Sequence, residues 1–198
     1  MLSHRVQVTS FGGSGTTALA RHLQEIGCSL PEELDWGVYK HRRQPPTADE
    51  APVDFRAIYL FSDPRDAVIS VFARGIQVWH FWRMQGHPPG WEGPYPDALE
   101  SLESFVEAGT DWYGIEDHFR RWTAPQPYPS LCIRHDGLQT AWPTIVHFLG
   151  LDNDARVFDW RPRLREHQAV DQAVRRGLDR IYGCVADMID AFPSISTR

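Results

Sequence analysis

One stretch near the start of the chain, Ser10–Thr17, restricts the possible folds more than any other. It consists of Ser-Phe-Gly-Gly-Ser-Gly-Thr-Thr and follows the alternating apolar run Val6–Thr9. The next run, Ala18–Ile26, carries its apolar residues at helical spacing, and Gly27 stands where a helix commonly ends. The pattern predicts a strand, a glycine-rich turn and a helix.

A turn of this kind makes an anion site, because backbone N–H groups and the positive end of a helix dipole point at one spot. Glycines allow an anion to approach the backbone closely, and hydroxyl groups add donors. The residues expected to form this site are Gly12, Gly13, Ser14, Gly15, Thr16 and Thr17. The stretch departs from the P-loop pattern G-x-x-x-x-G-K-[ST], since Ser10 replaces its first glycine and Thr16 its lysine. Taken alone, it is also compatible with a tight turn whose glycines serve only the bend.

Composition limits the possible functions. We expect one domain over residues 1–198, long enough for a proper hydrophobic core. The net charge of −6 argues against non-specific nucleic-acid binding, which needs a broad basic face. The basic residues are almost all arginines, and Lys40 is the only lysine. Chemistry that requires a lysine must therefore use Lys40.

The expected location is cytoplasmic. No signal peptide and no apolar run of membrane-spanning length is found, which predicts a protein with no membrane partner. Cys28, Cys132 and Cys184 lie far apart without a C-x-x-C pair, which favours a reducing compartment and no zinc site. The histidines show no convincing metal-ligand spacing, so no metal is expected. The oligomeric state is not predicted.

Further strands and helices alternate along the chain. Strands are predicted at Trp36–His41, Arg56–Phe61 and Ser130–Arg134, and the second is apolar enough to be buried on both faces. Asp63 and Pro64 then fit the N-cap and the first position of a helix that ends at Gly75. Later helices are predicted at 97–108, 115–122, 142–149 and 167–191, whereas 76–96, rich in Trp, is predicted to be irregular and lid-like.

This alternation predicts a three-layer α/β sandwich, in which helices flank a central, mostly parallel sheet of about four to five strands, as in P-loop NTPases. Ligands of such sheets bind outside the carboxyl ends of the strands. The polar segments expected at those ends are Ser10–Thr17, Lys40-His41, Ser62–Asp66 and His135-Asp136. Four strand ends that converge on one crevice favour the anion site over the simple turn.

At this point the chain resembles the sulfotransferases that use 3′-phosphoadenosine 5′-phosphosulfate (PAPS). Their first loop typically reads [ST]-[FY]-P-K-S-G-T-T, their second element K-T-H, and their third R-N-P-x-D followed by a helical serine. The matching segments, in the family's order, are Ser10–Thr17, Lys40-His41, Asp63–Asp66 with Ser70, Phe105 to Trp122, Arg134–Leu138 and Phe148–Leu151. The resemblance covers about residues 5 to 151, and the ordered set is more specific than any single motif.

The chain departs from the family at several positions. Gly13 replaces the loop lysine that contacts the leaving phosphate in the family, and Ser62 replaces the arginine that grips the 3′-phosphate. His135 stands where a tyrosine that contacts adenine is common. The family's C-terminal R-K-G loop is not evident, although three arginines occupy a comparable place, namely Arg161, Arg163 and Arg165.

The resemblance implies transfer of a sulfuryl group from PAPS, with PAP as the product, to a hydroxyl or amine of a small organic acceptor. The glycine-rich loop would hold the 5′-phosphosulfate, and Ser70 with Arg65 or the arginines at 161–165 would hold the 3′-phosphate. His41 is the candidate base, and Lys40 would stabilise charge on the leaving group. The tryptophans of 76–96 suggest an aromatic or otherwise organic acceptor, and they are equally compatible with a cap on the core.

Two other functions stay open. A P-loop-type small-molecule kinase using ATP and magnesium would have a Lys-[ST] pair in the loop, and Thr16 at the lysine position counts against it. A non-catalytic nucleotide-binding relic of the fold is supported by the replacements at Gly13 and Ser62. Some candidate residues also have an interpretation without a functional role. Lys40-His41 is also compatible with a solvated strand end, and Ser70 with a helix serine that bonds to a backbone carbonyl.

Overall fold

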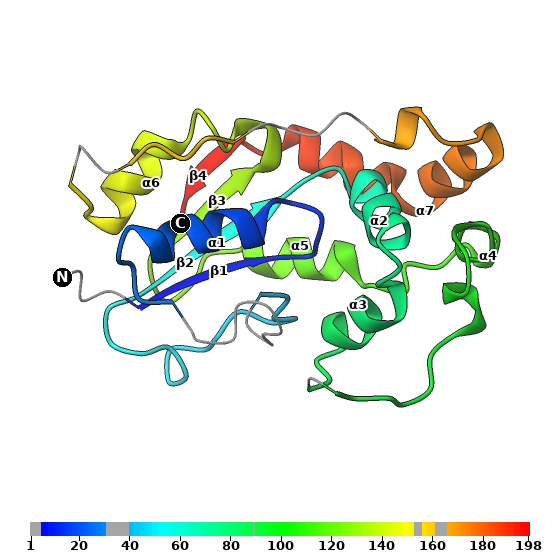
Figure 1. The fold of residues 1–198 in the computed structure, drawn as a ribbon, viewed down its shortest axis with the longest axis horizontal. Helices are drawn as coiled ribbons and strands as arrows, with labels where there is room; N and C mark the ends of the chain where they lie inside the picture. Colours follow the sequence, from blue (N-terminus) through cyan, green and yellow to red (C-terminus); the bar gives the residue numbers. More distant parts are fainter. Residues whose placement is uncertain (1–4, 31–39, 89, 153–155, 161–165) are drawn as a thin grey trace.

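The structure is a computed structural model that describes residues 5–30, 40–88, 90–152, 156–160 and 166–198 (Figure 1). The strands are β1 (Arg5–Ser10), β2 (Phe55–Phe61), β3 (Ser130–Arg134) and β4 (Ile195–Thr197). The α-helices are α1 (Thr16–Glu25), α2 (Pro64–Ala73), α3 (Gln77–Met84), α4 (Leu102–Ala108), α5 (Ile115–Thr123), α6 (Trp142–Leu149) and α7 (Gln172–Ala191). Short 3₁₀ turns lie at Asp97–Leu99, His135–Gly137 and Glu166–Gln168.

Within the described ranges, four strands form an open sheet in the order β1-β2-β3-β4. The pairs β1–β2 and β2–β3 are parallel, and β4 runs antiparallel to β3. The register places Ser10 beside Leu60 and Phe61 beside Arg134, so the carboxyl ends of the three parallel strands lie at one edge of the sheet. The prediction of a central, mostly parallel sheet flanked by helices is confirmed.

Both faces of the sheet are buried, which explains why β2 is apolar along its whole length. Ile58 and Leu60 point into a core built with α1 and α6. Ala57, Tyr59 and Phe61 point into the opposite core, to which α2, α4, α5 and α7 contribute. The alternation of side chains along one strand therefore divides the molecule into three layers.

Three predictions about the first two thirds of the chain need correction. The predicted strand Trp36–His41 lies partly outside the described residues, and its described end, Lys40-His41, is a turn. Segment 76–96 contains α3, which has buried His80 and Met84 one turn apart. The helix expected from Asp97 begins only at Leu102, where Ser101 caps it.

The last helix also begins later than predicted, at Gln172 and not near His167, because the Asp171 side chain accepts a hydrogen bond from the N–H of Ala173. Strand β4 was not predicted. It is short and carries Ser196 and Thr197, so only its pairing with β3 identifies it as a strand.

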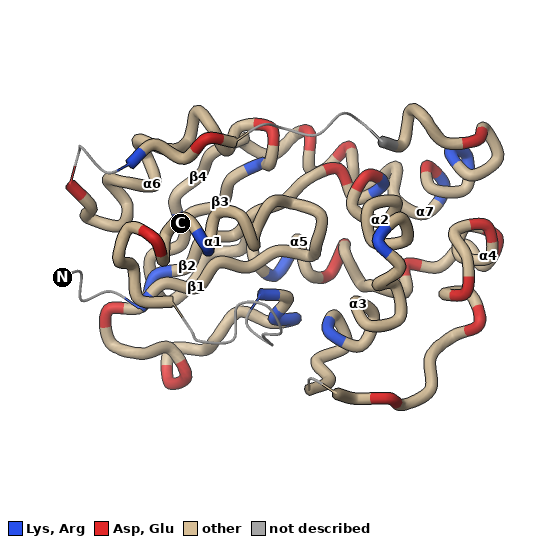
Figure 2. The backbone as a smooth tube through the Cα atoms, viewed as in Figure 1, with Lys and Arg blue, Asp and Glu red and all other residues tan. Residues whose placement is uncertain are grey.

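Charged residues are dispersed over the described part of the fold. Figure 2 shows basic and acidic positions on helices and loops throughout the fold, although α4 carries acidic positions alone. Within the described ranges, no helix combines the length and the apolar character that crossing a membrane would need.

Candidate functional site

The glycine-rich turn connects β1 to α1 in a conformation that most residues avoid. Gly12, Gly13 and Gly15 have φ angles of 110°, 66° and 80°. Gly15 is the N-cap of α1, and within the described part of the chain no side-chain hydrogen bond caps this helix. The first N–H groups of α1 therefore lack the side-chain acceptor that usually satisfies helix starts, as an anion-binding helix terminus requires.

At each of these three glycines, a side chain would overlap with a neighbouring residue. A Cβ on Gly12 would lie 2.6 Å from the His80 ring, and one on Gly15 would lie 2.6 Å from the Trp160 ring. A Cβ on Gly13 would lie 2.8 Å from the Cα of Ala67, at the start of α2. The turn is thus packed directly against three other segments, and its shape is fixed by them.

Hydroxyl groups hold the turn from within. Ser10 Oγ accepts hydrogen bonds from the Gly12 N–H (3.1 Å) and from Thr16 Oγ1 (2.6 Å). Ser14 Oγ donates to the Gly12 carbonyl at 2.9 Å and lies 3.1 Å from Ser62 Oγ, just after β2. Ser14 and Thr16, expected to be donors to an anion, are buried and bonded within the protein. An anion would therefore meet the backbone N–H groups more than these two hydroxyls.

Lys40 joins the site through both its backbone and its side chain. Its carbonyl accepts hydrogen bonds from the Ser10 N–H (3.0 Å) and from Thr9 Oγ1 (3.1 Å), which attaches the turn at Lys40-His41 to the end of β1. Its Nζ donates to Thr17 Oγ1, in the first turn of α1. The only lysine of the chain thus lies at the N-terminus of α1.

Two buried histidines bond to consecutive carbonyls of the turn. His41 Nδ1 lies 2.9 Å from the Ser10 carbonyl oxygen, and His80 Nε2 lies 2.9 Å from that of Phe11. Because a carbonyl can only accept, each of these nitrogens carries the proton, and His41 Nε2 retains its lone pair. Burial lowers the pKa of His41 well below 6.5, with smaller contributions from His80 and Lys40. Burial likewise lowers the pKa of His80 to about 4.

These groups line one pocket of about 230 Å³. Its walls are Ser10, Gly12–Ala18, Lys40, His41, Arg74, Ile76, Trp79, His80 and Trp160. Every predicted residue of the glycine-rich loop lines it, together with both predicted catalytic residues. Among the described residues of this lining, the cationic side chains are Lys40 and Arg74, and none is a carboxylate.

Sequence reasoning assigned no site role to Arg74, His80 or Trp160, and it left open whether Trp79 lines a pocket or covers the core. Arg74 follows Ser70 by one helical turn, which is the signal that would have pointed to it. Trp79 and His80 belong to the tryptophan-rich segment, whose role was left undecided. Trp160 is separated from the loop by more than 140 residues of sequence, so no local pattern could reveal their contact.

Arg65 lies outside this pocket, with its guanidinium bound to two carboxylates. It bonds Asp63 through Nε (2.9 Å) and Nη2 (2.7 Å), and Asp179 of α7 through Nη1 (2.7 Å). Although burial opposes ionisation, hydrogen bonds from Arg65 hold the pKa of Asp63 below its usual value. Ser70 is buried in α2 and does not line the pocket. The binding roles of Arg65 and Ser70 stay predictions.

His135 lies after β3 and is buried beside Trp160. The two rings meet edge to face with centroids 5.0 Å apart, and the His135 carbonyl accepts a hydrogen bond from Trp160 Nε1 at 3.2 Å. The end of β3 thereby reaches the glycine-rich turn through Trp160. Arg161, Arg163 and Arg165 lie outside the described residues.

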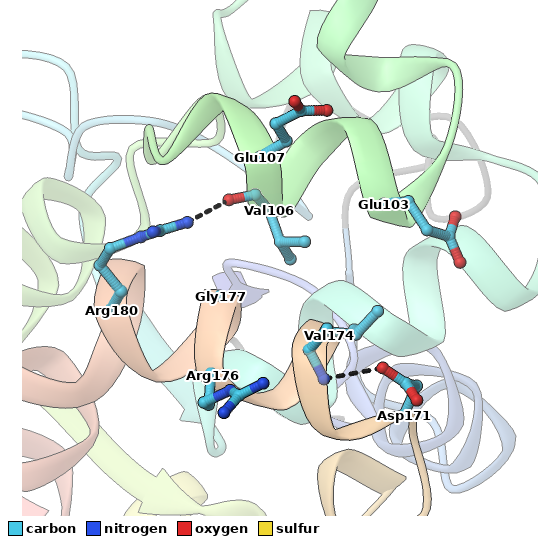
Figure 3. A pocket seen from close by; sticks show the side chains of 9 residues that line it. Glu103, Val106, Glu107, Asp171, Val174, Arg176, Gly177 and Arg180 are labelled. Carbon is cyan, nitrogen blue, oxygen red and sulfur yellow. Dashed lines mark hydrogen bonds between the residues drawn. The ribbon is translucent and has the colours of Figure 1, made fainter.

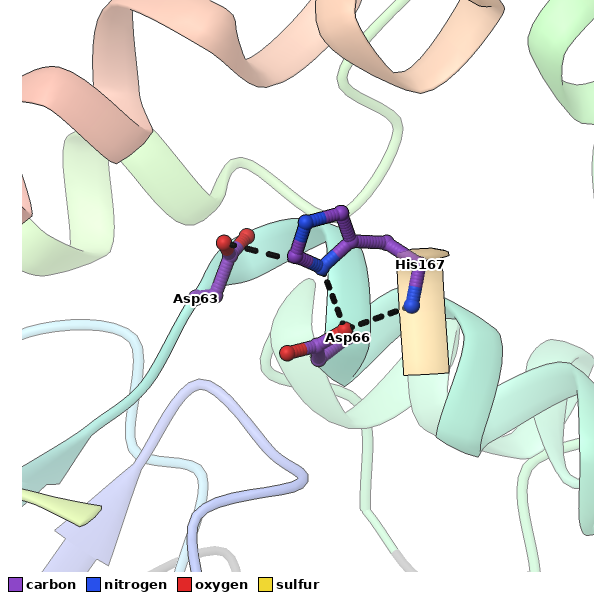
Figure 4. A group of neighbouring side chains, drawn as sticks. All are labelled: Asp63, Asp66 and His167. Carbon is purple, nitrogen blue, oxygen red and sulfur yellow. Dashed lines mark hydrogen bonds and ion pairs between the residues drawn. The ribbon is translucent and has the colours of Figure 1, made fainter. Parts of the chain in front are cut away.

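A group of potential metal ligands lies at the start of α2 (Figure 4). The ligand atoms of Asp63, Asp66 and His167 lie within 4.8 Å of one another. His167 bonds Asp66 through both its backbone N–H and Nδ1, each at 2.7 Å, and Asp63 is occupied by Arg65. These bonds explain why the three side chains lie close together: they connect α2 to the segment before α7.

A larger cavity of about 570 Å³ lies between α4 and α7 (Figure 3). Val106 packs so closely on Gly177 that a Cβ there would lie 2.5 Å from the Cβ of Val106. Arg180 donates to the Val106 carbonyl at 2.8 Å. Acidic side chains of α4 and basic side chains of α7 line this cavity, and none of the described lining residues is a buried polar one. The pocket at the glycine-rich turn is the better candidate.

Comparison with known proteins supports the fold. No family model and no curated protein matches the sequence. Among solved structures, mouse sulfotransferase SULT7A1 in complex with PAP is similar, with a TM-score of 0.53 over 96% of this chain and 89% of that chain. The chain has a sulfotransferase-like fold. At 16% sequence identity, the similarity to SULT7A1 establishes the fold and no more.

Proposed function

We propose that the chain is a PAPS-dependent sulfotransferase that acts on a hydroxyl or amine of a small organic acceptor. The observation that carries this proposal is the uncapped start of α1 in a pocket that also contains Lys40 and His41. The fold of a PAP-bound sulfotransferase gives further support. PAPS would be a co-substrate, and no metal is required for the proposed steps.

The glycine-rich turn would bind the phosphosulfate. Residues at the start of α1 line the pocket, where the free N–H groups of a helix N-terminus would bind an anion, and Lys40 adds a positive charge at Thr17. Donors fixed in advance stabilise the charge that develops on a leaving phosphate, because they need not reorganise during the reaction. Ser70, with Arg65 or the arginines at 161–165, is proposed for the 3′-phosphate.

His41 would act as the general base. Its Nδ1–H bonds to the Ser10 carbonyl, which fixes the ring and leaves the lone pair on Nε2. The acceptor proton would pass to Nε2 as a new bond forms between sulfur and the acceptor atom. The bond between sulfur and the phosphate oxygen breaks at the same time, and its electrons leave with PAP. Lys40 would then balance the charge on that phosphate.

The aromatic side of the pocket would receive the acceptor. Trp79 lies edge-on to His41, with ring centroids 6.4 Å apart, and Ile76 lines the same wall. An acceptor placed here would be adjacent to the proposed base. This arrangement favours an organic acceptor with an aromatic or apolar part.

The first experiment is a calorimetric titration of the protein with PAP, with ATP plus magnesium as the comparison ligand. We expect micromolar PAP binding that is weakened at least about tenfold by Lys40→Ala, since a charge-assisted hydrogen bond is lost. Arg43→Ala is the matched control, because Arg43 is exposed and bonds to Gln85. The Arg43→Ala variant should bind PAP with the same affinity as the wild type.

The same titration tests the two alternative functions. Binding of ATP with magnesium in place of PAP would indicate a kinase. Absence of both interactions in a folded sample would refute the proposed function and would indicate a relic that has also lost nucleotide binding. Ser70→Ala and Arg65→Ala, measured beside the wild type, test the proposed 3′-phosphate site, since loss of either side chain should weaken PAP binding.

A further inference from the structure

The peptide group between Phe11 and Gly12 is held at both of its polar atoms. Its carbonyl oxygen accepts a hydrogen bond from His80 Nε2 at 2.9 Å, and its N–H donates to Ser10 Oγ at 3.1 Å. A carbonyl oxygen carries a partial negative charge, so one that faced a bound anion would repel it. The orientation of this peptide group therefore matters for any anion that the turn binds.

The His80 ring also packs against the turn. A Cβ on Gly12 would lie 2.6 Å from Cε1 of this ring and 2.9 Å from its Nε2. Gly12 has a φ of 110°, a conformation that a residue with a side chain rarely adopts. The hydrogen bond and the packing of His80 thus act on the same point of the chain, where the turn leaves the direction of β1.

His80 is itself fixed by contacts that do not involve the turn. It is buried in α3, and its backbone N–H donates to the Ile76 carbonyl at 2.7 Å. Its ring meets the ring of Tyr113 edge to face, with centroids 5.1 Å apart. The position of α3 therefore determines where His80 lies, and His80 in turn holds the glycine-rich turn.

We propose that His80 is a positioning residue of the anion site: it keeps the Phe11 carbonyl bonded to the protein, so that this oxygen does not face a bound phosphate, and it fixes the shape of the turn. The inference rests on the proposed function of the pocket and deepens it. Burial lowers the pKa of His80 to about 4, so the ring is neutral near pH 7. His80 therefore acts through its hydrogen bond and its shape, and it adds no charge to the pocket.

The test compares His80→Phe and His80→Gln with the wild type in calorimetric titrations with PAP and with inorganic pyrophosphate. His80→Phe keeps a ring but has no donor for the Phe11 carbonyl, and we expect it to weaken both ligands at least about tenfold. A glutamine amide can donate to that carbonyl, so His80→Gln should recover part of the loss. Because neither variant removes a charge, the dependence of PAP affinity on salt should equal that of the wild type.

The matched control is His118→Phe. His118 is also buried, but it bonds to the Tyr59 hydroxyl and is not among the residues that line the pocket. This variant should lose stability and still bind PAP with wild-type affinity. If His118→Phe and His80→Phe weaken PAP equally, the effect is a general one and the role of His80 is refuted.

The outcomes separate this inference from the proposed function. Wild-type affinity for PAP in folded His80→Phe would overturn the role of His80 and leave the sulfotransferase proposal standing. Binding of pyrophosphate that depends on His80, without binding of PAP, would support the role of His80 and refute the proposed function. If the wild type binds neither ligand, both are wrong.

Circular dichroism in the far ultraviolet shows whether each variant is folded. If His80→Phe is not, His80→Gln and His80→Asn decide, since the shorter asparagine side chain does not reach the Phe11 carbonyl. We then expect His80→Gln to bind PAP about tenfold more tightly than His80→Asn, and equal affinities would overturn the role of His80.

Discussion

The ring of His41 lies edge-on to the ring of His80, with 4.8 Å between the ring centroids. Each donates a hydrogen bond to the turn, and the two acceptors are the carbonyls of consecutive residues, Ser10 and Phe11. The pair therefore fixes the direction of the chain just before the glycines. It also places a neutral imidazole at the pocket, since burial keeps both rings unprotonated near neutral pH.

This pair predicts a loss of stability in acid. The pKa of His80 is about 4 in the folded state and near 6.5 in an unfolded chain, so the unfolded state binds more protons between these values. Its contribution is complete above pH 6.5 and disappears as the pH falls to about 4, a loss of about 3 kcal/mol. His118, whose pKa burial lowers to about 3, and His41 act in the same direction.

Urea denaturation between pH 7.5 and pH 5 measures this effect. His80→Gln should reduce the slope of unfolding free energy against pH, whereas the exposed His147→Gln should leave it unchanged. Equal slopes in wild type and His80→Gln would show that His80 is not held neutral in the folded state.

Replacement of His41 should affect the rate of transfer more than the binding of the nucleotide. Loss of a general base typically costs two to four powers of ten in rate, so we expect His41→Gln to lower kcat about 100-fold or more. Because burial lowers the pKa of His41, wild-type kcat/KM should not fall as the pH drops from 7.5 to 6.5. A decline centred near pH 6.5 would contradict the assigned state of His41. His147→Gln serves as the control.

Placing a lysine at Gly13, as sulfotransferase loops have, should harm this protein. The φ angle of 66° and the contact with the Ala67 backbone both oppose a side chain. We expect Gly13→Lys to lose about 2–4 kcal/mol of stability, from backbone strain together with steric overlap. Gly150→Lys is a matched control, since Gly150 has a φ of 63° and open space around it. Thermal denaturation compares them, and equal losses would exclude the overlap with Ala67.

Gly15→Ala should displace Trp160 and weaken ligand binding. The added Cβ would lie 2.6 Å from the Trp160 ring. Gly114 is also a helix N-cap with positive φ, but a Cβ added there would meet no described neighbouring atom within 4 Å. Gly114→Ala therefore gives the cost of backbone strain alone, about 1 kcal/mol. We expect a larger loss for Gly15→Ala, part of which Trp160→Leu in the same chain should restore. A double-mutant cycle by urea denaturation measures this coupling, and additive effects would refute the contact.

Local sequence patterns were sufficient for part of the site, namely β1 with the glycine-rich turn and α1, and β2 with the start of α2. The glycine-rich turn requires positive φ angles that favour glycine, and Asp63 with Pro64 specifies the start of α2 through hydrogen bonding and a fixed backbone angle. The apolar run of β2 needs cover on both faces, which predicts a central strand. Each of these features depends on residues adjacent in sequence, so the order of strand, turn and helix followed from the sequence alone.

Contacts between distant residues decided the rest. Arg65 was predicted to bind phosphate, yet only the folded chain brings Asp179 to its guanidinium. Trp160 reaches Gly15, and β4 becomes a strand only by pairing with β3. Such contacts depend on how layers pack, and a short residue pattern carries no information about a partner that lies far away in the sequence. The sequence therefore determined which backbone could bind an anion, and the tertiary structure determined which side chains surround it.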